Sequence, residues 1–278
     1  MQKITINHIR RLKGAERPFA TLTAYDFTSA KIVDATGIPL ILVGDSAAMV
    51  MLGYDTTLPV SMDEMVMLTS AVCRGVKHAL VIADMPFMSY QASVSDALHS
   101  AGRFMKEAGA AGVKLEGGCR MNPQMRALVE NGIPVMGHIG LTPQSVHQFS
   151  GYTVQGKTVD AIHNLMDDAL AVADAGAFSL VLEGIPAEVA KMITQQIAIP
   201  TIGIGAGPHC DGQIQVFHDI LGLYTEFIPK HTRQFGQTAE HMTRSIQAYI
   251  ELVEARGFPS EENSTRLSAL VLDALTAK

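Results

Sequence analysis

The chain has 278 residues, 47% of them hydrophobic, which is enough for one large α/β domain with a full core. Its net charge of −6 and isoelectric point near 5.9 argue against a nucleic-acid-binding surface. No apolar run approaches the roughly 20 residues of a membrane span, and residues 1–20 lack the apolar core of a signal peptide. The scattered cysteines Cys73, Cys119 and Cys210 form no CxxC pair, so we expect reduced thiols and a cytoplasmic protein.

Short apolar segments alternate with amphipathic ones along the chain. The predicted strands are residues 19–24, 39–43, 80–83, 112–115, 134–138, 178–182, 200–203 and 224–228. The predicted helices are residues 4–12, 27–35, 62–74, 93–109, 123–131, 158–174, 186–197, 211–221 and 239–254. Eight such units that close on themselves predict an α/β fold, a (β/α)8 TIM barrel. We expect a single barrel domain over residues 1–258, with 239–254 as its last helix, and a tail over residues 259–278.

Acidic side chains follow three neighbouring strands at the point where each strand ends. Asp45 comes after the strand at 39–43, Asp84 after the next, and Glu116 after the third. Parallel α/β folds place their sites at strand carboxyl ends, so the three carboxylates should meet at one mouth. Hard oxygen ligands without a nearby thiolate favour Mg²⁺. The alternative is three separate helix caps or salt bridges.

Other polar residues end the same strands. Lys114 lies two residues before Glu116, so both side chains can face the same way. Lys114 can serve as a salt-bridge partner of the acids or hold a substrate carboxylate, and His138 can be a core histidine. Ser46 follows Asp45, and Glu183 ends the strand at 178–182.

A glycine-rich stretch, GIGAG at residues 203–207, resembles the phosphate-binding loops of other barrels. The signal is weak. A tight turn, where the backbone closely approaches a ligand or a helix, explains it equally well.

Nine stretches together resemble one family, the ketopantoate hydroxymethyltransferases, also called 3-methyl-2-oxobutanoate hydroxymethyltransferases. They are TAYD at 23–26, VGDS at 43–46, GYDTTLPV at 53–60, ADMPF at 83–87, VKLEGG at 113–118, GHIGLTPQS at 137–145, GYTVQG at 151–156, IGIGAG at 202–207 and DGQ at 211–213. The resemblance extends in order from about residue 4 to 265. Leu68, Ser150 and His231 depart from the family pattern.

The resemblance implies a Mg²⁺-dependent barrel that transfers a hydroxymethyl group from 5,10-methylenetetrahydrofolate to 3-methyl-2-oxobutanoate. The product, 2-dehydropantoate, would serve pantothenate and coenzyme A biosynthesis, and the reaction would pass through a Mg-stabilised enolate. Carried onto this chain, the implied metal ligands are Asp45, Asp84 and Glu116, and the implied base is Glu183. The implied substrate contacts are Asp45, Ser46, Asp84 and Lys114, with His138 as a further contact.

The family also implies a homo-oligomer, a decamer of two stacked rings of five barrels. Two other functions remain open. A related barrel could use the same chemistry for C–C lysis, as in the isocitrate lyase-like group, although the stretch KKCGH that is typical of those lyases is absent. A barrel without catalytic activity could act as a binding or assembly protein.

Overall fold

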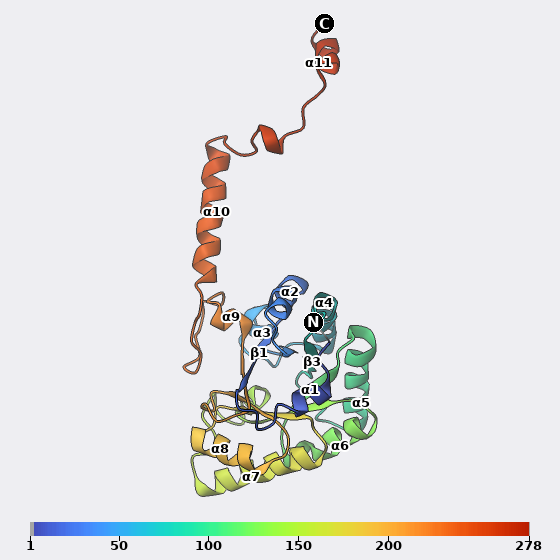
Figure 1. Ribbon diagram of the computed structural model, residues 1–278, viewed down its shortest axis with the longest axis vertical. Coiled ribbons are helices and arrows are strands. Elements are labelled where there is room, and N and C mark those ends of the chain that lie inside the picture. Colours follow the sequence, from blue (N-terminus) through green and yellow to red (C-terminus); the bar gives the residue numbers. More distant parts are fainter. Residues whose placement is uncertain (1–2, 278) are drawn as a thin grey trace.

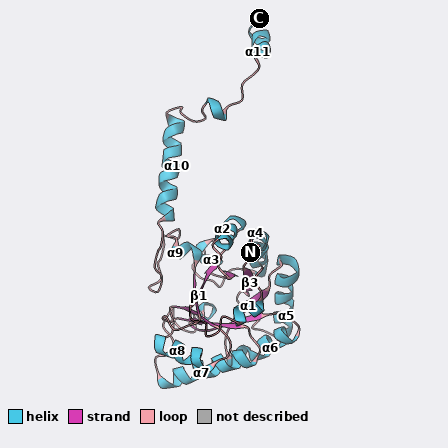
Figure 2. Cartoon of the chain, viewed as in Figure 1, coloured by secondary structure: helices cyan, strands magenta, loops and turns pink. Residues whose placement is uncertain are grey.

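The computed structural model describes residues 3–277, and its eight strands form a closed parallel barrel in chain order. Figure 1 and Figure 2 show helices surrounding this barrel. The strands are β1 (Phe19–Thr23), β2 (Leu40–Val43), β3 (Leu80–Asp84), β4 (Gly112–Glu116), β5 (Val135–Gly140), β6 (Ser179–Glu183), β7 (Thr201–Ile204) and β8 (Gly212–Gln215). The predicted (β/α)8 TIM barrel is confirmed.

The α-helices follow the strands of the barrel with one gap, since only a loop joins β7 to β8. They are α1 (Ile6–Arg10), α2 (Phe27–Ala35), α3 (Ala47–Val50), α4 (Met62–Gly75), α5 (Val94–Arg103), α6 (Asn122–Glu130), α7 (Val159–Asp174), α8 (Ala187–Gln196), α9 (Phe217–Ile220), α10 (Thr238–Glu254) and α11 (Ala269–Thr276). A π-helical turn, η1 (Phe104–Ala108), continues α5, and the short 3₁₀ turns are η2 (Cys119–Met121), η3 (Pro143–Ser145) and η4 (Glu261–Asn263). The helix predicted over 93–109 is therefore divided between two helix types.

Two apolar layers cover the two faces of the barrel sheet, one in the lumen and one between the strands and the helices, because successive residues of a strand face opposite sides of the sheet. Leu40 and Leu42 of β2 lie in the lumen cluster, whereas Ile41 and Val43 lie in the cluster that includes helix residues. Ile9 of α1 is fully buried in the lumen cluster. The short N-terminal helix thus supplies part of the packed interior and leaves the opposite, carboxyl end of the strands for the site.

The last strand differs from the prediction. The structure places β8 at Gly212–Gln215, inside the helix predicted over 211–221, and residues 224–228 form no strand. Ile214 faces the lumen cluster, and β8 pairs with both β7 and β1 to close the barrel. The sequence GQIQ carries only one apolar residue, so its strand character comes from closing the barrel rather than from its own propensity.

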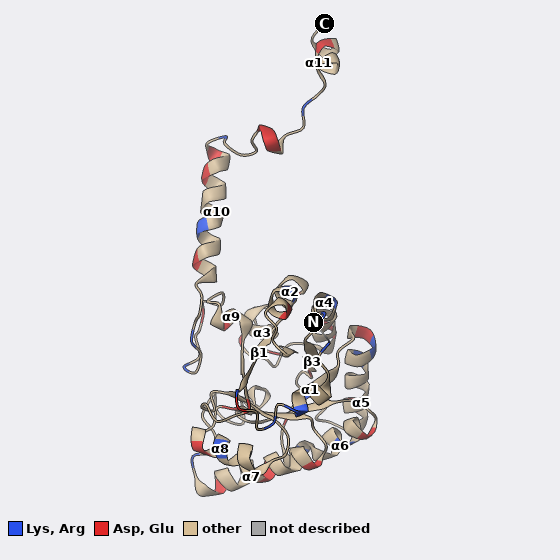
Figure 3. Ribbon diagram, viewed as in Figure 1, with Lys and Arg blue, Asp and Glu red and all other residues tan. Residues whose placement is uncertain are grey.

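The helix predicted over 239–254 forms as α10, but it does not cover the barrel. None of its residues is buried, and it projects away from the barrel together with α11 (Figure 1). Charged residues are spread along it (Figure 3). No described helix is both long enough and apolar enough to cross a membrane.

Candidate active site

All seven side chains singled out in the sequence line one cavity of about 110 Å³ at the carboxyl end of the strands. These residues are Asp45, Ser46, Asp84, Lys114, Glu116, His138 and Glu183. Strand register brings them together, because Asp84 pairs with Lys114 and Glu116 with His138 on adjacent strands. The convergence expected from the strand-end positions is therefore observed.

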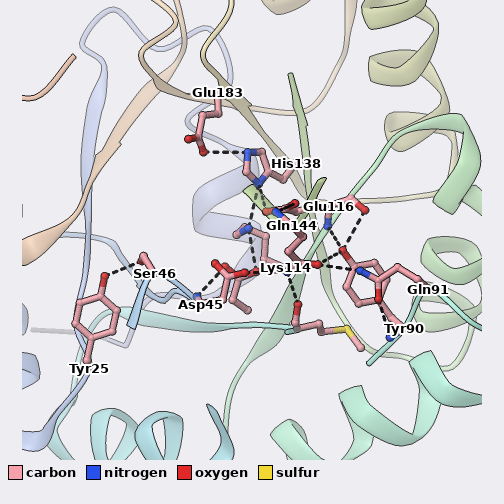
Figure 4. Close-up of polar contacts among 12 residues, drawn as sticks. Tyr25, Asp45, Ser46, Tyr90, Gln91, Lys114, Glu116, His138, Gln144 and Glu183 are labelled. Carbon is pink, nitrogen blue, oxygen red and sulfur yellow. Dashed lines mark hydrogen bonds and ion pairs between the residues drawn. The ribbon is translucent and has the colours of Figure 1, made fainter. Parts of the chain in front are cut away.

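Lys114 is the centre of the charged groups in this cavity (Figure 4). Its Nζ lies 2.9 Å from Asp84 Oδ1 and 3.1 Å from His138 Nδ1, with the lysine side chain only 4% exposed. Burial lowers the pKa of Lys114, but the carboxylates of Asp84, Glu116 and Asp45 outweigh it and raise the pKa above its ordinary value. The lysine therefore stays a cation.

The acids of the cavity repel one another at close range. Burial, followed by the charges of Asp84 and Glu116, raises the pKa of the Asp45 carboxyl well above its ordinary value. Burial also raises the pKa of Asp84, against the lowering effect of Lys114. A single lysine does not balance three buried carboxylates, so the cavity favours the binding of further positive charge.

Gln144 donates hydrogen bonds to two of these acids (Figure 4). The sequence analysis did not single out this residue. Its Nε2 donates to Asp45 Oδ2 at 2.9 Å, and its backbone N–H donates to Glu116 Oε2 at 3.0 Å. Its Oε1 accepts from Tyr90 Oη and Gln91 Nε2, each at 2.9 Å. Gln144 lies within the GHIGLTPQS stretch, but a single glutamine in a loop has no spacing pattern that reveals such contacts.

Ser46 is held by a second residue that was missed, Tyr25. The two hydroxyls lie 2.8 Å apart, and Tyr25 is fully buried. Gly44 makes room for this arrangement, since a Cβ there would lie 2.8 Å from Ser46 Oγ. The glycine after β2 thus leaves room for the serine hydroxyl beside Tyr25.

His138 joins Lys114 to Glu183. Lysine can only donate, so His138 Nδ1 accepts from Nζ and the ring proton lies on Nε2, 3.2 Å from Glu183 Oε2. Burial and Lys114 lower the pKa of His138, but Glu116 and Glu183 outweigh them and raise it to about 9. A second ring proton on Nδ1 would face the Lys114 ammonium at 3.1 Å, so this contact opposes the protonation that the two carboxylates favour.

The carboxylates do not already form a ready set of metal ligands. Among residues 3–277, no group of three or more His, Cys, Asp or Glu side chains is arranged to hold a metal ion. Asp84 faces Lys114, whereas Asp45 and Glu116 accept from Gln144. Nevertheless, Glu116 Oε1 is buried without a hydrogen-bond donor, and the set of hard oxygens fits a divalent cation.

The glycines of residues 203–207 serve close packing. A Cβ at Gly205, whose φ is +61°, would lie 3.2 Å from the His231 ring, and one at Gly207 would collide with Ala187 at the start of α8. These contacts agree with a tight turn in which the backbone approaches a helix.

Comparisons with known proteins give one consistent result. Residues 3–261 match the family described as Ketopantoate hydroxymethyltransferase. A 3-methyl-2-oxobutanoate hydroxymethyltransferase of Syntrophobacter fumaroxidans is 54% identical over 96% of this chain and 95% of that protein. One of Carboxydothermus hydrogenoformans is 49% identical over 99% of this chain and 100% of that protein.

Solved structures show the same fold at low sequence identity. A phosphonopyruvate hydrolase in complex with oxalate and Mg²⁺ gives a TM-score of 0.60 at 12% identity, covering 99% of this chain and 95% of that chain. A 2,3-dimethylmalate lyase, a member of the PEP mutase/isocitrate lyase superfamily, gives 0.58 at 16% identity, with 99% and 95% covered. At these identities the likeness supports the barrel fold alone.

Proposed function

Because this chain belongs to the ketopantoate hydroxymethyltransferase family, we propose that it transfers a hydroxymethyl group from 5,10-methylenetetrahydrofolate to 3-methyl-2-oxobutanoate. The product is 2-dehydropantoate, a precursor of pantothenate. The observation that carries the proposal is the single cavity lined by one buried lysine, a histidine and four carboxylates. This combination suits a small anionic keto acid that must lose a proton.

The keto acid contacts assigned here are Asp45, Ser46, Asp84, Lys114 and His138. Lys114 is a buried cation beside the acids, so it is the group that holds the substrate carboxylate or keto oxygen. The Ser46 hydroxyl, held by Tyr25, supplies a neutral donor at the same cavity. His138 lies on the other side of Lys114 and contacts the substrate more weakly.

Asp45, Asp84 and Glu116 are the residues that would hold Mg²⁺. Three observations support this assignment: the hard oxygen donors, the mutual repulsion of the acids, and a buried Glu116 Oε1 that accepts no hydrogen bond. The ion would supply Lewis acidity that polarises the keto acid and offsets the negative charge developing on it. Gln144 donates hydrogen bonds to both Asp45 and Glu116, and so sets the distance between the two carboxylates.

Glu183 is the proposed base that takes the proton from C3. Its side chain is 16% exposed, so it keeps access to the cavity. His138 lies against Oε2, while Oε1 accepts no hydrogen bond from any other residue between 3 and 277. The histidine thus positions the carboxylate and leaves one oxygen free for the proton.

Proton loss leaves C3 as the carbon nucleophile. The new C–C bond forms to the methylene carbon of the folate, the bonds from this carbon to N5 and N10 break, and water supplies the hydroxyl group. The C3 proton and the other proton of the water end on the two folate nitrogens. Tetrahydrofolate leaves, so one water is consumed and no oxidant or reductant is needed.

We also propose a homo-oligomer, with a decamer as its specific form. Five apolar residues of α10 lie on one helical face and are exposed in the single chain: Met242, Ile246, Tyr249, Ile250 and Val253. Apolar faces of this kind are expected to be covered in solution. A neighbouring copy of the chain is the occupant that the family assembly suggests.

Turnover tests the proposed function. Purified protein given methylenetetrahydrofolate, 3-methyl-2-oxobutanoate and Mg²⁺ should form 2-dehydropantoate, and exhaustive chelation should abolish the reaction until Mg²⁺ is restored. Activity that survives chelation would remove the metal from the proposal. Cleavage of C–C bonds without folate would favour a lyase, and no reaction would favour a binding protein.

A further inference from the structure

Two further cavities adjoin each other beside the catalytic cavity. Their volumes are about 430 Å³ and 340 Å³. The residues that line both are Gly117, Arg120, Thr142, Ser145 and Gln148. We call the two together the Arg120 groove.

The Arg120 groove reaches the catalytic cavity through Glu116. This residue lines both the larger cavity of the groove and the catalytic cavity. Tyr90 and Gln144 also line the larger cavity, and they are hydrogen-bonded to each other at 2.9 Å. A molecule in the groove would therefore lie against the side chains that hold the catalytic carboxylates.

One wall of the larger cavity is apolar and open to solvent. Phe87 is 40% exposed and Met88 is 55% exposed, and Leu58 and Met121 also line this cavity. Met88 has a φ of +63°, a left-handed conformation that is costly for a side chain of this size. The chain holds Met88 at the surface in spite of this cost, beside the exposed Phe87, as a site for a flat ring would need.

Arg120 brings a positive charge to the groove. Among residues 3–277, it is the only Lys or Arg that lines either cavity. It is exposed and forms no ion pair with another residue in that range. The loop that carries it is fixed, because Cys119 N donates to Asp168 Oδ1 at 2.8 Å. Gly118 has no room for a Cβ against Asp168. The guanidinium is therefore available for an anionic ligand at a defined place.

We propose that the Arg120 groove binds the folate cosubstrate, with its ring system on the apolar wall near Glu116 and its glutamate carboxylates on Arg120. This assignment rests on the proposed function. Tetrahydrofolate has a flat pterin, an aminobenzoyl ring and a terminal glutamate with two carboxylates. The groove offers complementary surfaces, since Phe87 and Met88 suit the rings, Gln148 offers an amide, and Arg120 suits the carboxylates.

A pair of ligands tests the position of the glutamate. Keto-acid-saturated protein is titrated by calorimetry with tetrahydrofolate and with tetrahydropteroate, which lacks the glutamate. The original protein should bind tetrahydrofolate about tenfold more tightly, as one charge-assisted pair predicts. Arg120→Ala should bind both ligands equally, because only the contact with the glutamate is lost.

Two further variants sharpen the result. Arg126→Ala removes an exposed arginine of α6 that lines neither cavity, and should keep the tenfold preference. Phe87→Ala removes part of the apolar wall and should lower the affinity for both ligands by the same factor. An Arg120→Ala protein that retains the preference would overturn the assignment, as would an original protein that shows no preference.

The groove and the proposed function fail in different ways. If the original protein forms product but Arg120→Ala behaves like it with both ligands, only the groove assignment falls. If the original protein neither forms product nor binds either ligand, the proposed function falls, and the groove assignment falls with it.

Discussion

Single side chains in this site hold one another in place, and Gln144 is the clearest case. It contacts Asp45 and Glu116 while its own carbonyl is held by Tyr90 and Gln91. All polar atoms of its amide group thus have partners, which fixes its orientation. A glutamine so constrained sets the distance between two carboxylates that would otherwise repel each other.

Lys114 carries the first prediction. Replacing it with methionine, Lys114→Met, keeps much of the volume but removes the cation that faces the substrate carboxylate. We expect the affinity for 3-methyl-2-oxobutanoate to fall about tenfold or more, with a loss of rate. Calorimetry with Mg²⁺ present measures the binding.

Lys106→Met is the matched control for this prediction. Lys106 is exposed on η1, outside the three cavities, so its loss should change neither binding nor rate. Unchanged keto-acid binding by a folded Lys114→Met protein would leave Lys114 as a salt-bridge partner of Asp84.

The position of the site could be predicted from the sequence, but its hydrogen-bond network could not. Asp45, Asp84 and Glu116 each follow an apolar run, and the geometry of parallel barrels then brings them together. Gln144 lies in the short turn η3 and Tyr90 in the loop after β3, and Gln144 contacts Asp45 and Glu116 at the ends of two other strands. Their contacts depend on loop conformation, which no periodicity in the sequence encodes.

At the scale of elements, barrel closure overrides local propensity at β8. Seven strands are apolar runs that the sequence reveals, whereas GQIQ has one inward isoleucine between two glutamines. The stretch predicted as a strand at 224–228 has the sequence YTEFI, forms no strand and leaves Phe227 exposed. Backbone pairing with β1 and β7 stabilises this strand, although its residues have little strand propensity of their own. Pairing between residues far apart in the sequence leaves no local pattern from which the strand could be predicted.

The short helix α9 carries a prediction about pH. Burial raises the pKa of Asp219 to about 6, and its unfolded value is about 3.9. Between these values the folded state binds more protons than the unfolded state, so this group lowers the stability as pH rises from about 4 to 6. Asp219→Asn should therefore be more stable at pH 7, by about 2 kcal/mol.

Thermal unfolding at several pH values checks the effect of Asp219. The difference between Asp219→Asn and the original protein should shrink as pH falls and vanish near pH 4. A difference that does not depend on pH would mean that the substitution acts through packing and not through charge.

At the scale of the whole molecule, the barrel is not covered evenly. Only a loop joins β7 to β8, and α10 projects from the barrel with an exposed apolar face (Figure 1). We place the boundary of the barrel domain near residue 258 as a proposal, with residues 259–278 as a tail. In an assembly, the apolar face of α10 would pack against another copy of the chain, since no residue of this helix is buried in its own chain.

Sedimentation tests this proposal. The original protein should sediment well above the 29.8 kDa of one chain, with ten chains as the specific expectation. Ile246→Glu places a charge on the apolar face of α10 and should shift the population to smaller species. Arg244→Glu, a charge change on the same helix outside that face, should not. An original protein of 29.8 kDa at assay concentrations would contradict the oligomer.

The central claim is that Glu183 takes the proton from C3 of the keto acid. Proton exchange at C3 in D₂O, followed by NMR with Mg²⁺ and without folate, tests it most directly because no later step contributes. The original protein and the control Glu188→Gln, an exposed residue of α8, should exchange the C3 proton. Glu183→Gln should keep its fold and keto-acid affinity, yet lose exchange and turnover. Exchange at the original rate in a folded Glu183→Gln protein would contradict the claim and assign the base elsewhere.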